Sequence, residues 1–154
     1  MYKEQIFKKL TRNDTGETMS HQSGITIPKN VADSPIFPEM TTTELNPRKD
    51  VVFWDEEGNK WTFQYIYYND MFFGKERSKS HNEHRLTCVK NFLRAYDIKS
   101  EDEIWFAIDE NKKRHIGYIR NENTDTNSTQ SDNITEKNGR IVLKIGTNWK
   151  KIKL

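Results

Sequence analysis

The alternation of apolar and polar residues along the chain predicts more strand than helix. The clearest case is residues 51–68, where two apolar runs, 51–54 and 60–68, flank the turn sequence EEGN and so predict a β-hairpin. Three aromatic residues in the second run alternate with polar ones and therefore share one strand face: Trp61, Phe63 and Tyr65.

The same pattern predicts further short elements on both sides of this hairpin. Strands are expected at 6–10, 24–27, 104–108, 115–120, 140–146 and, as a last edge strand, 149–154. We expect a helical turn at 28–31 and a turn at 109–112. The clearest helix spans 85–96, because Leu86, Val89, Leu93 and Tyr96 recur at spacings of three and four.

One segment has almost no apolar residues, and the rest fits one domain. Residues 121–138 read NENTDTNSTQSDNITEKN, so we expect a flexible loop there. A chain of 154 residues is near the modal domain size, and its 12% aromatic residues can fill a small core although only 33% of residues are hydrophobic. Many short strands with one or two helices predict a single, mostly β domain over 1–154, a mixed, mainly antiparallel barrel or sandwich.

Charge is unevenly distributed although the net charge is only +2. Residues 75–99 carry seven Lys or Arg against three acidic residues, and 137–154 carry six basic residues and no acidic one. Acidic residues gather at 55–57 and 101–110. This distribution predicts a basic side and an acidic side, with scattered solvated charge as the alternative for each run taken singly.

Several chemistries are disfavoured by what the sequence lacks. Cys88 is the only cysteine, which excludes an intramolecular disulfide and a four-cysteine zinc site. His81, His84 and Cys88 would approach one another on a helical turn, but no fourth ligand is evident, so we expect neither a metal nor another cofactor. No signal peptide or membrane-spanning run is evident, and a cytoplasmic protein without membrane partners is expected.

The candidate chemistry begins in the polar loop of residues 10–28. Its side chains can donate to or accept from DNA base edges and phosphates: Arg12, Asn13, Asp14, Thr15, Ser20, His21 and Gln22. An ordinary Asx turn at Asn13–Gly16 is the alternative interpretation.

A second segment, residues 67–87, joins this loop in a resemblance to a known family. Through several ungapped matches in the same order, the chain resembles the N-terminal effector DNA-binding domain of EcoRII-type restriction endonucleases over about residues 3–110. The matching residues are NDTG at 13–16, His21-Gln22, Gly24, Ile27-Pro28, TELNP at 43–47, Tyr67-Tyr68-Asn69, Phe73-Gly74-Lys75, Arg77, Asn82-Glu83 and Arg85-Leu86-Thr87.

This resemblance implies a fold, a partner and a set of contacts. The fold is the open seven-stranded DNA-binding pseudobarrel, also found in plant auxin-response factors and in the target-binding domains of BfiI and LlaJI-type systems. Two projecting loops would grip double-stranded DNA in the major groove, and a nuclease or NTPase domain or subunit of a restriction system would be the protein partner.

Transferred position by position, the resemblance aligns His21 with a histidine of the family's first arm that contacts DNA, and Thr26 with an aromatic residue that contacts DNA. In the second arm, the family's charged residues align with Lys75, Arg77, Glu83 and Arg85. His84 stands where the family has lysine. For Lys79 and Arg94, a phosphate contact, which positions the protein without reading bases, is an equal alternative to a base contact. Arg and Lys can bond to guanine, and Glu can accept from the amino group of cytosine.

Two departures affect the arms. Met19-Ser20 replaces a pair of small residues, and 78–81 is an insertion in the second arm. We therefore do not expect the target sequence of EcoRII itself.

Catalysis within the chain is the alternative to a binding module. Glu110-Asn111-Lys112 matches the (D/E)-x-K pattern of metal-dependent nucleases, but it falls in a predicted turn without an acidic partner. No P-loop, nucleophile elbow or HExxH motif is present. A third possibility is a single-strand or RNA-binding module that stacks bases on the aromatic strand at 61–68, near Lys75. We expect a non-catalytic domain that recognises duplex DNA.

Overall fold

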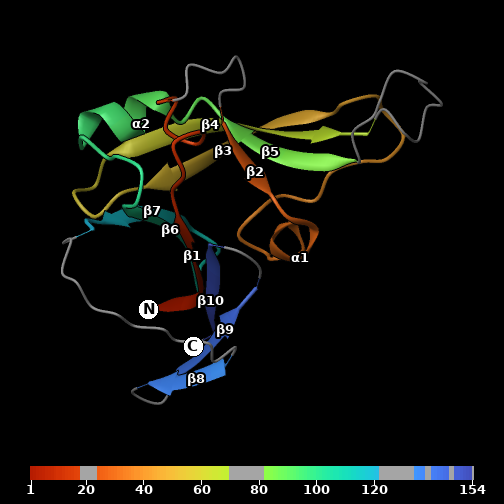
Figure 1. Cartoon of the computed structure of the whole chain (residues 1–154). Helices are drawn as coiled ribbons and strands as arrows, with labels where there is room; N and C mark the ends of the chain where they lie inside the picture. Colours follow the sequence, from red (N-terminus) through yellow and green to blue (C-terminus); the bar gives the residue numbers. More distant parts are fainter. Residues whose placement is uncertain (18–23, 70–81, 122–133, 138–139, 146–147, 154) are drawn as a thin grey trace.

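The computed structural model describes residues 1–17, 24–69, 82–121, 134–137, 140–145 and 148–153 (Figure 1). These residues form ten strands and two short helices. In chain order they are β1 (Tyr2–Lys9), β2 (Ile25–Ile27), α1 (Lys29–Ala32), β3 (Arg48–Trp54), β4 (Lys60–Tyr68), β5 (Glu83–Thr87), α2 (Lys90–Ala95), β6 (Glu103–Asp109), β7 (Arg114–Ile119), β8 (Ile134–Lys137), β9 (Arg140–Lys144) and β10 (Trp149–Lys153).

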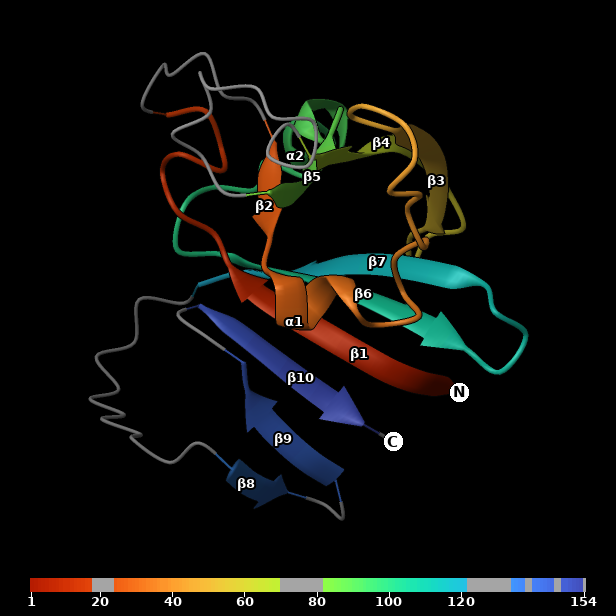
Figure 2. The same ribbon diagram turned by 90° about the vertical axis from the view of Figure 1, so that its right-hand side faces the viewer.

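All ten strands belong to one curled sheet. Its order is β2-β5-β4-β3-β7-β6-β1-β10-β9-β8, and its pairs are antiparallel except for β3 and β7, which meet in parallel at Trp54 and His115. Figure 2 shows β2, β5, β4 and β3 curled above β7, β6 and β1. This is the expected mostly β, open pseudobarrel with mixed strands, built from ten strands rather than seven.

Aromatic side chains fill the space inside the curl. Phe37 packs on Phe53, Tyr65 and Phe106 with ring centroids 5.4 to 6.5 Å apart, and all four are buried. The predicted alternation in β4 is confirmed, since Phe63 and Tyr65 are buried. A few large rings thus give a chain of low apolar content a continuous core.

The prediction of a helix at 85–96 is wrong for the first half of that segment. Residues Glu83–Thr87 form β5, and α2 starts only at Lys90. β5 pairs with β4 on one side and β2 on the other, and these two ladders outweigh the local helical spacing. Cys88, with φ 66°, ends the strand. His84 and Cys88 therefore do not share a helical turn, and His81 lies outside the described residues.

Two expectations near the C-terminus also need correction. Residues Ile134–Lys137, within the expected flexible loop at 121–138, form β8, which pairs with β9. β10 is not an edge strand, because it pairs with both β1 and β9. The edges of the sheet are β2 and β8.

The other turns and elements follow the sequence prediction. The hairpin at 51–68 is present as β3 and β4, and Glu110-Asn111-Lys112 forms the exposed turn between β6 and β7. The longer of the two helices has six residues, and no helix in the described part of the chain is long and apolar enough to cross a membrane.

Candidate nucleic-acid interface

The structure locates eight of the predicted contact residues. They are Arg12, Asn13, Asp14, Thr15, Thr26, Glu83, His84 and Arg85. The remaining six, Ser20, His21, Gln22, Lys75, Arg77 and Lys79, lie outside the residues that the structure describes.

Three of the eight share one face of the sheet. The register places Thr26 opposite Arg85, and Glu83 stands two residues before Arg85 on the same strand. Residues directly opposite in an antiparallel pair, like those two apart on a strand, point to the same side. The other side buries Ile25 and Leu86. Thr26, Glu83 and Arg85 thus form a polar surface, here called the outer face.

The outer face lies between the attachment points of the two predicted arms. The second arm leaves β4 after Asn69 and rejoins the sheet at Asn82, beside Tyr68 and Glu83, which are paired. The first arm rejoins at Gly24, next to the opposite end of β5. A Cβ on Gly24 would lie 2.8 Å from the Leu86 carbonyl oxygen, and its φ is +128°, so only glycine fits there. The five residues of β5 separate the two points by ~17 Å.

Arg85 is held on this face with an incomplete set of partners. Its Nη2 lies 2.5 Å from Glu83 Oε1, and its guanidinium lies 5.7 Å from the centre of the Tyr68 ring. Only 15% of its side chain is exposed, yet its Nε has no hydrogen-bond partner among the residues that the structure describes. The nearby Asn82 Oδ1 is buried and unpartnered as well. Because an unsatisfied buried polar atom is destabilising, a ligand that supplies the partner would bind favourably here.

His84 faces the other side of the sheet and is not brought together with Thr26 and Arg85. Its ring stacks on Tyr67 at 4.3 Å and 13°, and on Tyr65 at 5.6 Å and 25°. Burial lowers the pKa of His84, and the negative charge of Asp33 opposes this only partly. Burial thus favours the neutral form of the stacked His84 ring, whereas a lysine at this position would carry a charge.

The start of the first arm is fixed by a buried ion pair that the sequence did not indicate. Lys8 Nζ lies 2.5 Å from Asp14 Oδ2, and both residues are buried. The Thr11 backbone N–H donates to the same carboxylate at 2.9 Å, and the Asp14 N–H donates to Thr11 Oγ1 at 3.2 Å. The Thr-x-x-Asp spacing resembles a capping box and was the available signal. Asp14 therefore shapes the turn, while Arg12, Asn13 and Thr15 lie nearer its surface.

The start of the second arm is fixed by two asparagines. The Asn46 N–H donates to Asn69 Oδ1 at 2.7 Å, and the Asn69 N–H donates to Asn46 Oδ1 at 3.1 Å. Asn69 Nδ2 also donates to the Glu44 carbonyl at 2.7 Å. This reciprocal clasp, fully buried at Asn69, explains why TELNP and Tyr67-Tyr68-Asn69 belong to one sequence pattern.

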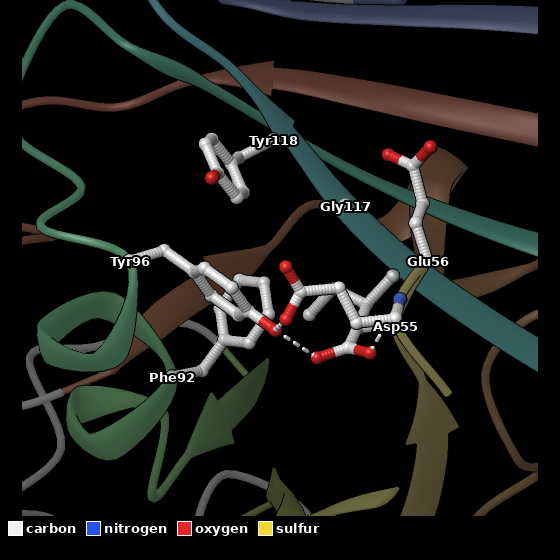
Figure 3. A pocket seen from close by; sticks show the side chains of 8 residues that line it. Asp55, Glu56, Phe92, Tyr96, Gly117 and Tyr118 are labelled. Atoms are coloured by element: carbon white, nitrogen blue, oxygen red, sulfur yellow. Dashed lines mark hydrogen bonds between the residues drawn. The ribbon is translucent and has the colours of Figure 1, made fainter. Parts of the chain in front are cut away.

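The acidic run at 55–57 forms a separate structural site (Figure 3). A cavity of about 290 Å³ lies between these residues, α2 and β7. Asp55 accepts hydrogen bonds from the backbone of Glu57 and Asn59, from Trp61 Nε1 at 2.9 Å and from the Tyr96 hydroxyl. Burial alone would raise the pKa of Asp55, but these hydrogen bonds lower it to about 2. The same bond to Asp55 raises the pKa of Tyr96 to about 12.

A curled open sheet with a polar face between two loop attachment points is the architecture of the DNA-binding pseudobarrels. Residues 3–101 match the family described as restriction endonuclease EcoRII, N-terminal. Since the match covers more than half of the chain, the chain belongs to this family.

Individual relatives agree with this assignment. The chain is 38% identical to the type II restriction enzyme EcoRII of Escherichia coli over 88 residues, 52% of this chain and 19% of the enzyme. It is 26% identical to auxin response factor 11 of Oryza sativa over 117 residues, 76% of this chain and 11% of that protein. The chain thus spans less than a fifth of the length of these relatives.

A solved structure shows the same fold. The protein in the Arabidopsis FUS3-DNA complex superposes with a TM-score of 0.56 at 20% sequence identity. The match covers 74% of this chain and 94% of that chain.

Proposed function

We propose that this domain recognises a specific sequence in double-stranded DNA through two arms in the major groove, as the target- or effector-binding domain of a restriction system. The observation that carries the proposal is the outer face, where Thr26, Glu83 and Arg85 stand between the attachment points of both arms. Membership of the EcoRII N-terminal family and a fold shared with a protein solved on DNA support it.

The pair on the outer face suggests how a base pair would be read. The Arg85 guanidinium can donate to O6 and N7 of guanine, and the Glu83 carboxylate can accept from the amino group of cytosine. In the absence of DNA the Arg85 guanidinium donates one hydrogen bond to the Glu83 carboxylate, and Arg85 Nε has no partner among the described residues. The pair therefore holds Arg85 in place until base edges supply better partners.

Cleavage is assigned in this proposal to another domain or subunit. Among the described residues no group of three or more His, Cys, Asp or Glu side chains is placed to hold a metal. Glu110 and Lys112 are both exposed in a turn. The matched relatives are several times longer than this chain and leave room for such a domain.

Selection from a random duplex library tests the proposal. We expect one enriched sequence that single-stranded DNA and RNA do not displace, and no cleavage by the purified chain with Mg²⁺. Equal binding of all duplexes, or tighter binding of single strands or RNA, would contradict the recognition of duplex sequence. Cleavage that Glu110→Ala abolishes would show a nuclease instead.

A further inference from the structure

A small hollow lies between the turn that opens the first arm and helix α2. Its volume is about 210 Å³, and its wall includes Thr15 and Gly16 from the turn and Lys90 and Arg94 from the helix. α2 follows the end of β5 after only two residues, so the hollow lies at the end of the outer face where the first arm rejoins the sheet.

The helix presents two positive charges to this hollow. Lys90 and Arg94 are four residues apart and therefore lie on the same side of the helix. The opposite side is fixed in the core, since Phe92 is fully buried and Leu93 is 5% exposed. Both basic residues are exposed, and neither side chain has a hydrogen-bond or ion-pair partner within the described part of the chain. Two adjacent, unneutralised cations on a rigid support attract a bound anion.

The turn on the other wall leaves room for that anion. Gly16 has φ +81°, and nothing lies within 4 Å of the position its Cβ would take. The buried pair of Lys8 and Asp14 fixes the turn. One acidic residue, Asp97, also lines the hollow, but its carboxylate lies 3.7 Å from Lys99 Nζ, which offsets part of its charge.

We propose that Lys90 and Arg94 bind a phosphate of the DNA backbone beside the first arm. The site rests on duplex binding as proposed above, but not on sequence preference, because phosphate contacts position a protein on DNA without reading bases. Its role is to hold the duplex against the outer face while the arms read the groove.

Salt dependence of binding distinguishes this site from a base-reading one. Lys90→Gln and Arg94→Gln are each expected to weaken binding to the selected duplex and to a random duplex by the same factor. Each is expected to reduce the slope of log K against log salt by roughly one. Lys3→Gln is the matched control, because Lys3 is exposed near the start of β1, at the end of that strand remote from the turn, and carries the same charge. It is expected to leave the slope unchanged, and all three variants are expected to melt as the wild type does.

Replacing single phosphates of the DNA backbone with an uncharged analogue identifies the phosphate that the protein contacts. A single methylphosphonate, moved along the duplex, is expected to weaken wild-type binding at one position and to have no effect there on the double variant. Slopes equal to that of Lys3→Gln, or a changed ratio of specific to non-specific binding, would overturn the proposal. If the wild type shows no sequence preference while both variants lower the slope, the phosphate site stands and sequence-specific recognition falls.

Discussion

Asp55 and Arg85 are both mostly buried charged residues, but they differ in how completely they are hydrogen-bonded. The Asp55 carboxylate accepts from two backbone N–H groups and from the side chains of Asn59, Trp61 and Tyr96. Within the described part of the chain, Arg85 has one carboxylate partner, Glu83, and its Nε has no hydrogen-bond partner. The complete network of Asp55 stabilises the fold, whereas Arg85, on the polar outer face, keeps hydrogen-bonding capacity for a ligand.

The largest effect is expected at the buried ion pair of Lys8 and Asp14. Asp14→Ala leaves a buried lysine without its partner, and we expect a loss of ~3–5 kcal/mol in the free energy of unfolding, measured with urea. Lys8→Met combined with Asp14→Leu should recover most of it, because both charges are then removed. A stable Asp14→Ala protein that has lost only DNA binding would instead make Asp14 a contact residue.

Asp55→Ala is expected to reduce the free energy of unfolding by ~2–3 kcal/mol, since it leaves several donors, the Trp61 indole among them, without an acceptor. The ratio of specific to non-specific DNA binding should not change. Glu56→Ala, at the exposed neighbouring position, is the control and should have little effect on stability. If Asp55→Ala impaired recognition in a fully folded protein, the contrast with Arg85 would fail.

Arg85→Ala is expected to impair DNA recognition while changing the stability of the fold little. It should lower affinity for the best site by ~1–3 kcal/mol and relax the preference at one base position. The loss in stability should stay below ~1 kcal/mol, because the pair with Glu83 is partly exposed. Binding titrations on the selected duplex and on single-base variants of it would measure both the affinity and the preference.

A smaller effect is expected at acid pH, where protonation of Asp55 reduces the stability of the fold. Its pKa is about 2 in the folded protein and near 3.8 otherwise, so its ionised form is favoured by folding. This stabilisation is complete above about pH 4 and is lost as the pH falls towards 2. The difference in urea midpoint between wild type and Asp55→Asn should therefore shrink over that range. A constant difference would contradict the role of the carboxylate charge.

The sequence predicted the fold class well where side-chain pattern and pairing agree. The hairpin at 51–68 has alternating aromatic residues and a turn sequence, and both act within 18 consecutive residues. At 83–87 the local pattern and the strand pairing disagree. Leu86 would face the core in either a helix or a strand, and the pairing with β2 and β4 is what makes this segment a strand. β8 was missed because polar residues dominate NITEKN, and backbone pairing with β9 needs no apolar signal.

The contact residues came mainly from the resemblance and remain predictions. The resemblance assigned Thr26 to one arm and Glu83 and Arg85 to the other, and the pairing of β2 with β5 places all three on one face. His84 points to the opposite side, because neighbouring residues on a strand alternate in direction. Asn46 and Asn69 lie 23 residues apart, so no local pattern reveals their clasp. At Asp14 the Thr-x-x-Asp spacing indicates the turn but not the ion pair with Lys8.

We propose that the two arms and the outer face read the DNA sequence together. The most direct test is the ratio of affinities for the selected duplex and for a random duplex, measured for the wild type, His21→Ala and Arg85→Ala at one salt concentration. We predict a large ratio for the wild type and a marked fall for each variant, with non-specific affinity reduced much less. A ratio that neither substitution changes would contradict the two-arm account and leave only the fold in common with the DNA-binding relatives.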